Sequence, residues 1–321
     1  MAKGQASTAF GEKTTTIGDR AFISGQSTNK AIDKIRNEDG TIKTTSEINS
    51  AWGTAKFSLA LGEASSIFGR DSLALGAQSF AAGFQVRAQG DYSIATGKDS
   101  NASGNNAFAG GASTIAKGTA SLAFGSGSSA YGNQSIALGQ NTSACGNRSF
   151  AAGASGNKAI YYLQDDATQQ INQWKNQKFA LAKGEASTVF GTNCMTLKAN
   201  SFAAGSMLLA KNENQAVFGS YNSYTSSSAL FTVGNGASDT NRSNAFEVYT
   251  DGRAELQTQG ETENSVVIKS HLDKNINALD NVLVDILAAI QLNKSDAETI
   301  DAIEQTIVSY LETKTVVEVE E

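Results

Sequence analysis

The chain has 321 residues, a formal net charge of −6 and no proline. No basic stripe runs along it, so the composition excludes a nucleic-acid-binding protein, which needs Lys and Arg to neutralise phosphates. No apolar stretch approaches the roughly eighteen residues of a membrane span, so we expect no membrane insertion.

The chain begins with glycines that lie seven residues apart, Gly11, Gly18 and Gly25. The amino terminus has no apolar run behind a basic start, so we expect no secretory signal peptide. From about residue 26 to residue 56 the glycine spacing is lost. We interpret this segment as an insert.

Between Phe57 and Gly153 a glycine occupies every seventh position, fourteen times without a miss. Alanine stands two positions before thirteen of these glycines, Ile67 being the exception, and Ser or Thr stands four positions before twelve of them. A helix would lose about 1 kcal/mol at each glycine, and the apolar residues lie two apart, which is strand spacing. Each unit is therefore predicted to be a short strand followed by a turn in which glycine provides positive φ.

A period of fourteen residues is superimposed on the period of seven. Large apolar residues stand three positions before every second glycine, namely Phe80, Ile94, Phe108, Leu122, Ile136 and Phe150. One coil is therefore predicted to hold two strands and two turns, and the coils to stack as a parallel solenoid. The opposite face carries only alanine, which predicts that a symmetry-related copy packs closely against residues such as Ala123 and Ala137.

These repeated Ser-apolar-Ala-apolar-Gly units resemble the YadA-like head repeat of trimeric autotransporter adhesins, which is also found in bacteriophage fibre proteins. The resemblance covers about residues 4–25, 57–153 and 180–219. It implies a mainly β fold, a left-handed parallel β-roll, in which three chains lie side by side around one axis. The alanines at positions 123 and 137 would then serve trimer packing.

A second insert runs from about residue 154 to residue 178, and the roll is expected to end near residue 225. Both inserts open with Asn-Lys-Ala-Ile and carry one tryptophan shortly before the roll resumes, so we interpret them as a duplication. A helix is compatible with the spacing around Ile171. Loops on a rigid scaffold often carry recognition, which makes the aromatic residues of the inserts candidate partner contacts: Trp52, Tyr161, Tyr162 and Trp174. The alternative is that they pack the inserts onto neighbouring chains.

The C-terminal part changes character. Residues 226–269 are predicted to form a small β module, with strands at 230–236 and 241–252, and the module resembles one common in phage tail-fibre proteins. Residues 270–314 are predicted to form a helical hairpin that trimerises or docks, and residues 315–321 an acidic tail. The expected seam follows heptad spacing and contains Ile276, Leu279, Leu283, Ile286 and Ile290.

Residues with catalytic chemistry are few. His271 is the one histidine, and the sequence contains no spacing typical of metal ligands. We expect Cys145 and Cys194 to be buried as small apolar side chains. We expect no cofactor, no metal and no enzymatic activity. A polysaccharide-degrading tailspike is disfavoured, because a rod of Ala and Ser offers no cleft for paired carboxylates.

The sequence therefore predicts a non-enzymatic, homotrimeric structural fibre protein of a bacteriophage virion, in a tail or head fibre. Its expected role is host-surface attachment or the linking of fibre parts. Its expected partners are other virion proteins and a host cell-surface glycan or protein, and it would be made in the host cytoplasm. The alternative is a bacterial cell-surface trimeric adhesin, which would need a signal peptide and a membrane anchor.

Overall fold

The computed structural model describes residues 1–256 and ten further positions: 279, 281, 282, 284, 286, 301–303, 305 and 306. The chain divides into two units, Met1–Ala254 and Glu255–Glu321. The ten positions of the second unit are all helical, in agreement with the helices expected there. Leu279 and Ile286 of the expected seam are among them, whereas Ile276, Leu283 and Ile290 lie outside the described residues.

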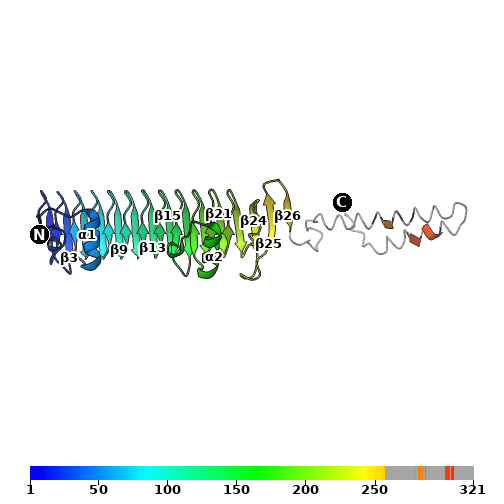
Figure 1. Ribbon diagram of the computed structural model, residues 1–321, viewed down its shortest axis with the longest axis horizontal. Helices are drawn as coiled ribbons and strands as arrows, with labels where there is room; N and C mark the ends of the chain where they lie inside the picture. The colour runs from blue at the N-terminus through cyan, green and yellow to red at the C-terminus, as the bar shows by residue number, and fades with distance from the viewer. Residues whose placement is uncertain are drawn as a thin grey trace, which may run out of the picture. The chain divides into compact units, whose positions relative to one another are not determined.

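The first unit is mainly β and consists of stacked coils that run along one axis (Figure 1). Each full coil contributes a five-residue strand to a long sheet and a strand of two or three residues to a short sheet. The long sheet contains β1 (Thr8–Phe10), β3 (Phe22–Gln26), β5 (Ser66–Arg70), β7 (Phe80–Phe84), β9 (Ile94–Lys98), β11 (Phe108–Ala112), β13 (Leu122–Ser126), β15 (Ile136–Gln140), β17 (Phe150–Ala154), β19 (Thr188–Thr192), β21 (Phe202–Ser206), β23 (Ala216–Ser220), β24 (Ala229–Asn235), β25 (Asn244–Tyr249) and β26 (Ala254–Leu256). The short sheet contains β2 (Thr15–Thr16), β4 (Leu59–Ala60), β6 (Leu73–Ala74), β8 (Arg87–Ala88), β10 (Asn101–Ala102), β12 (Ile115–Ala116), β14 (Ser129–Ala130), β16 (Thr142–Ala144), β18 (Ala180–Ala182), β20 (Met195–Thr196) and β22 (Leu209–Ala210).

The strand register confirms the coil length of fourteen residues. Phe108 pairs with Leu122 in parallel, and Leu122 pairs with Ile136. The short sheet has the same register, with Arg87 opposite Asn101 and Asn101 opposite Ile115. Long parallel sheets of regularly spaced strands are the arrangement of a β-roll.

The glycines serve two different purposes, and the expectation that they provide positive φ holds for only half of them. Gly125, at the end of a long strand, has a φ of +119°. Gly118, in the other half of the coil, does not adopt positive φ, but a Cβ there would lie 1.9 Å from the carbonyl oxygen of Gly132 in the next coil. The left-handed residue of that turn is Ala120, with a φ of 53°. Close stacking of coils, rather than backbone conformation, therefore requires glycine in this row.

The roll ends in a small change of sheet topology. β24 continues the long sheet in parallel with β23, and β25 then turns back antiparallel to β24. The two strands expected at 230–236 and 241–252 are thus present and belong to the long sheet.

Two inserts leave the roll, one between β3 and β4 and the other between β17 and β18. The first (insert 1) contains the 3₁₀ helix η1 (Ala31–Asp33) and the helix α1 (Thr45–Thr54). The second (insert 2) contains η2 (Ala159–Tyr162) and α2 (Ala167–Gln177). The helix compatible with the spacing around Ile171 is therefore present as α2. Helix α1 was not expected, although a capping box between Thr44 and Glu47 marks its start.

Candidate functional site: the outer faces of the roll and its two inserts

The alanine row lies inside the roll. Ala123 and Ala137 have no exposed surface and pack in one core with alanines of the short sheet, such as Ala130. The expectation that this row faces a second copy is therefore wrong. Successive residues of a strand point to opposite sides, so alanine and the larger apolar residue next to it point in opposite directions. The closed coil of fourteen residues has room inside mainly for methyl-sized side chains, so the alanine takes the inner side. The large apolar residues consequently point outward.

Phenylalanine rings form three runs of contacts along the outer face of the long sheet, from Phe10 to Phe80, between Phe108 and Phe124, and from Phe150 to Phe246. Neighbouring rings have centroids 5.0 to 6.4 Å apart, and these contacts involve twelve of the fifteen phenylalanines of the chain. The rings are Phe10, Phe22, Phe68, Phe80, Phe108, Phe124, Phe150, Phe190, Phe202, Phe218, Phe231 and Phe246. We call this surface the aromatic face.

Much of the aromatic face is uncovered in the single chain. The exposed fraction is 53 % for Phe124, 43 % for Phe190 and 60 % for Phe10. Soluble monomers seldom expose an apolar patch that continues over many residues, and such patches usually mark contact surfaces. The aromatic face is therefore a candidate protein contact.

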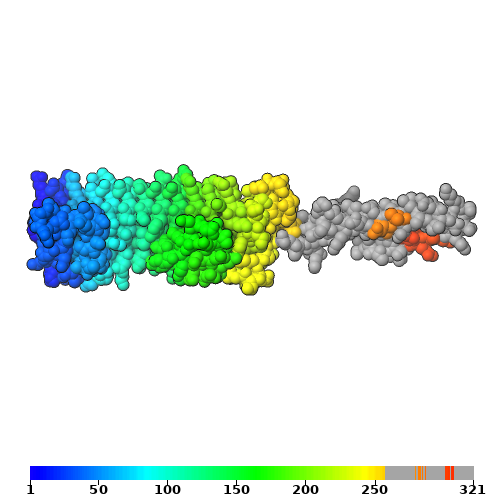
Figure 2. Space-filling model, viewed as in Figure 1, coloured from blue at the N-terminus to red at the C-terminus, as the bar shows by residue number. Residues whose placement is uncertain are grey.

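The outer face of the short sheet changes its residue types along the roll. Under the inserts its side chains are large, apolar and buried: Leu59, Leu73, Leu181, Met195 and Leu209. Between the inserts, the positions that point the same way are mostly polar: Arg87, Gln89, Asn101, Ser103 and Lys117. Figure 2 shows insert 1 and insert 2 as two protrusions with the surface of the roll exposed between them. Apolar residues on the outer face of the short sheet thus mark the coils that an insert covers, and polar residues mark the coils between the inserts.

Insert 1 is attached to the roll by a buried tryptophan. The side chain of Trp52 is 5 % exposed and packs with Ile48, Phe57 and Leu73. Its indole N–H donates to the carbonyl oxygen of Phe57 at 3.1 Å and to that of Asp71 at 3.2 Å. A buried indole N–H needs such acceptors. The ring therefore fixes the insert on the coil that follows it.

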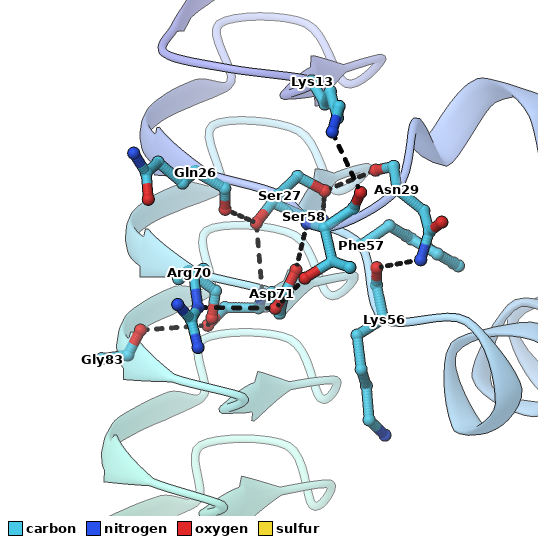
Figure 3. Close-up of polar contacts among 12 residues, drawn as sticks. Lys13, Gln26, Ser27, Asn29, Lys56, Phe57, Ser58, Arg70, Asp71 and Gly83 are labelled. Atoms are coloured by element: carbon cyan, nitrogen blue, oxygen red, sulfur yellow. Dashed lines mark hydrogen bonds and ion pairs between the residues drawn. The ribbon is translucent and has the colours of Figure 1, made fainter.

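A polar network closes the junction between insert 1 and the roll (Figure 3). The hydroxyl of Ser27 donates to the carbonyl oxygen of Asn29 at 2.6 Å and accepts from the backbone N–H of Ser58 at 2.8 Å. The buried carboxylate of Asp71 accepts from the backbone N–H and the hydroxyl of Thr28, at 2.6 and 2.7 Å. In Figure 3 the side chain of Lys56 extends away from this network.

Insert 2 repeats the attachment. Trp174 is fully buried and its indole N–H donates to the carbonyl oxygen of Asn193 at 2.9 Å. The ring of Tyr162 stacks on Phe179 at 5.9 Å with an interplanar angle of 4°. Tyr161, in contrast, is 70 % exposed.

These positions revise the list of candidate partner contacts. Trp52 and Trp174 are buried in their own chain, so neither ring offers a surface to a partner. Tyr162 is half-buried against its own insert, and Tyr161 alone of the four residues is largely exposed. The tryptophans hold the inserts on the roll, because a large ring with one donor both fills the space and satisfies a backbone carbonyl.

Two cations lie against each tryptophan ring. Lys56 Nζ is 3.5 Å and Arg87 Cζ 5.1 Å from the centre of the Trp52 ring. For Trp174 the corresponding distances are 5.7 Å to Lys178 Nζ and 5.1 Å to Arg242 Cζ. Sequence analysis missed these residues. The lysine four positions after each tryptophan is visible in the sequence, whereas Arg242 comes from the loop between β24 and β25 and leaves no local signal.

The charge balance differs between the two pairs. The carboxylate of Asp239 lies 2.6 Å from both Lys178 Nζ and Arg242 Nη2. Burial acts to raise the pKa of Asp239, but hydrogen bonds from these two cations outweigh it and lower the pKa. Neither Lys56 nor Arg87 has a carboxylate within 4.0 Å in the part of the chain that the structure describes.

Elsewhere the described residues hold little that could do chemistry. No group of three or more His, Cys, Asp or Glu side chains among them could hold a metal ion. No helix of the described part is long and apolar enough to cross a membrane. Both cysteines are free thiols, and burial raises the pKa of Cys145 to about 12 and that of Cys194 to about 11.

Comparison with protein families matches the YadA head domain repeat (2 copies) to residues 88–114, 116–142 and 133–155. Comparison with curated proteins gave no match. The matched residues begin in β8 and end just beyond β17. This part of the chain therefore consists of YadA head repeats, and the register of its coils continues on both sides of it, from β1 to β23.

Proposed function

We propose that the chain is a subunit of a non-enzymatic, homotrimeric fibre in which three rolls associate through their aromatic faces. The observation that carries this proposal is the row of partly exposed phenylalanines on one side of the long sheet, of which Phe124 is 53 % exposed. Burying apolar surface contributes about 25 cal/mol per Å², so covering such a row along many coils stabilises an assembly strongly. Three-fold packing is the arrangement that the YadA head repeats suggest.

The role we propose for this fibre is attachment to a surface, or the linking of fibre parts. YadA head repeats are typically non-catalytic parts of adhesins, which supports attachment over catalysis. The rigid roll provides length, and the inserts present exposed loops along it. A capsule-degrading activity is the outcome that would contradict this role, and it would be detected as soluble sugar released from purified capsular polysaccharide.

The setting we propose is a bacteriophage virion, in a tail or head fibre. The resemblance of residues 226–269 to a module of phage tail fibres supports it. The match to YadA head repeats also favours a second candidate, a trimeric adhesin on a bacterial surface. Immunogold labelling of particles and of cells that produce the chain separates the two, because gold on purified particles supports a virion protein and gold on the cell envelope supports an adhesin.

Residues 270–314 are proposed to trimerise the chain or to dock it on another virion protein. Heptad spacing supports this assignment, as does the helical state of the ten described positions in this part of the chain. Deleting residues 270–321 should abolish particle attachment or trimers. If the truncated chain still trimerises and joins particles but no longer adsorbs to cells, this part of the chain is the receptor-binding end instead.

The mass of the purified chain in solution tests the assembly directly. We expect sedimentation equilibrium to give three times the chain mass of 33.4 kDa at micromolar concentration. A stable monomer under these conditions would contradict the proposal, because the aromatic face would then remain uncovered.

A further inference from the structure

At each insert a lysine and an arginine lie beside a buried tryptophan, but among residues 1–256 a carboxylate pairs with the two cations only at insert 2. Lys56 and Lys178 each follow a tryptophan by four residues, and an arginine from another part of the chain reaches the same ring in both inserts. At insert 2 the arginine is Arg242, and the carboxylate of Asp239 forms an ion pair with both cations. Trp52 thus has the same kinds of cation beside it as Trp174, but among the described residues no carboxylate pairs with them.

Within the described part of the chain, no acidic side chain takes the place of Asp239 beside Lys56 and Arg87. The carboxylate of Asp71 is already bound by Thr28 and lies 3.6 Å from the guanidinium of Arg70. Asp99 and Asp71 both act on Lys56 as more distant charges, outside ion-pair distance.

The two cations of insert 1 are held together in spite of their mutual repulsion. Burial, and then the charge of Arg87, lower the pKa of Lys56, and burial lowers the pKa of Arg87. Lys56 Nζ lies 3.5 Å and Arg87 Cζ 5.1 Å from the centre of the Trp52 ring, where the π-system attracts both cations. Among the described residues no carboxylate forms an ion pair with either cation, so both can donate charge-assisted hydrogen bonds to the carboxylate of a ligand.

The surface that adjoins this pair is polar. Asn101 lies one coil further along the short sheet, in register with Arg87, and Ser103 follows it. The amide of Gln89 donates to Asn49 of α1 at 2.8 Å. Amides and hydroxyls are the partners of sugar hydroxyl groups, whereas the core of a protein–protein interface is depleted of charge and enriched in aromatic residues. The surroundings therefore favour a carbohydrate over a protein partner.

We propose that Lys56 and Arg87, held against Trp52, bind the carboxylate of an acidic sugar in a surface glycan. Asp239, in the loop between β24 and β25, occupies beside Trp174 the place that this carboxylate would take beside Trp52. The inference names the ligand class for the attachment role proposed above, and it rests on that role.

Fluorine NMR of the full chain labelled with 5-fluorotryptophan tests the site, because the chain has two tryptophans and hence two signals. Trigalacturonate is the probe, with maltotriose as the neutral sugar and a triglutamate peptide as the acidic peptide. We expect trigalacturonate to shift the Trp52 signal and not the Trp174 signal, and the shift to weaken as salt is added. No shift at millimolar trigalacturonate, an equal shift with maltotriose, or a stronger response to triglutamate would overturn the proposal.

Four variants make the assignment specific. Arg87→Gln and Lys56→Gln should each weaken trigalacturonate binding at least tenfold, whereas Lys98→Gln, an exposed lysine at the end of β9, should leave it unchanged. Asp239→Asn should open the corresponding site of insert 2, so that trigalacturonate shifts the Trp174 signal as well. Circular dichroism checks that each variant is folded. Unchanged binding by Arg87→Gln would overturn the proposal.

Adsorption to cells separates this inference from the attachment role itself. A native chain that does not adsorb contradicts the attachment role. A native chain that adsorbs, with an Arg87→Gln variant that adsorbs equally well, contradicts the acidic-glycan site alone.

Discussion

The indole N–H of Trp174 donates to the carbonyl oxygen of Asn193, nineteen residues further along the chain. Trp52 donates to Asp71 over the same separation of nineteen residues. In both cases the acceptor belongs to a turn residue in the left-handed region, with φ of 53° for Asn193 and 55° for Asp71. The duplication of the inserts therefore extends to the way in which each one is attached to the roll.

Replacing either tryptophan should loosen its own insert and leave the roll intact. Trp52→Ala and Trp174→Ala remove a buried ring, which costs on the order of 3–5 kcal/mol, but repeats in a solenoid contact only their neighbours. Hydrogen exchange should increase in residues 27–57 for Trp52→Ala and in residues 155–179 for Trp174→Ala. Trimers should persist, and Tyr161→Ala should change neither segment. Faster exchange along the whole long sheet would contradict local attachment.

Substitution inside the roll should affect folding. Ala137 is fully buried among other small side chains, so Ala137→Leu should destabilise the chain by about 1–3 kcal/mol through overpacking. Ser121→Ala is the matched control, because the buried hydroxyl of Ser121 has no hydrogen-bond partner among the residues that the structure describes, so its loss should be neutral. Thermal unfolding measures both. Equal melting temperatures for the two variants would show that the interior has spare room.

Substitution on the aromatic face should affect assembly instead. Phe124→Ser replaces a ring that is 53 % exposed in the single chain, so the fold should survive and the trimer should weaken. Sedimentation together with circular dichroism distinguishes the two effects. Tyr161→Ser, also highly exposed but on insert 2, should leave the mass unchanged. A Phe124→Ser variant that stays fully trimeric would exclude this face from the interface.

The sequence alone predicts the coil but not which of its faces is inside. Glycine spacing and strand alternation predict two strands and two turns in each coil, and the register confirms them. Alternation also makes both faces of the long strand apolar, alanine on one and a larger residue such as Leu122 on the other. The choice between them depends on the room inside the closed coil. Our expectation that Ala123 and Ala137 face a second copy failed for this reason.

The candidate site could be predicted only in part. Both inserts and their tryptophans are visible as a duplicated pattern, but burial of Trp174 depends on the side chains that the insert meets on the short sheet, such as Leu209. Arg242 reaches the same ring from a loop far along the chain, and Asp239 accompanies it. No local pattern encodes such contacts.

The two thiols should react slowly in the folded chain and should make it less stable at high pH. Burial disfavours the thiolate and raises the pKa of Cys145 to about 12 and that of Cys194 to about 11, against roughly 8.5 for a free cysteine. Above about pH 8.5 the unfolded chain loses these protons and the folded chain keeps them, so stability falls as pH rises.

Rates of alkylation by iodoacetamide test this prediction. In the folded chain the rate should rise about tenfold per pH unit between pH 8 and 10, because it follows the thiolate fraction. In guanidinium chloride the rate should level off above pH 9. Cys145→Ala and Cys194→Ala identify which thiol is measured. A plateau below pH 9 in the folded chain would contradict the raised pKa values.

Two glycine-to-alanine substitutions should have opposite effects. A Cβ at Gly118 would lie 1.9 Å from the carbonyl oxygen of Gly132, so Gly118→Ala must push neighbouring coils apart and should destabilise the chain by more than about 1 kcal/mol. Gly53 lies in α1 with nothing within 4 Å of its Cβ position, so Gly53→Ala should stabilise the chain by about 0.5–1 kcal/mol. Melting temperatures at one protein concentration measure both shifts. Since Gly118 does not adopt positive φ, its backbone conformation suits alanine, and only the contact between coils forbids it. A Gly118→Ala variant as stable as the native chain would therefore show that the coils are not stacked closely enough to require glycine.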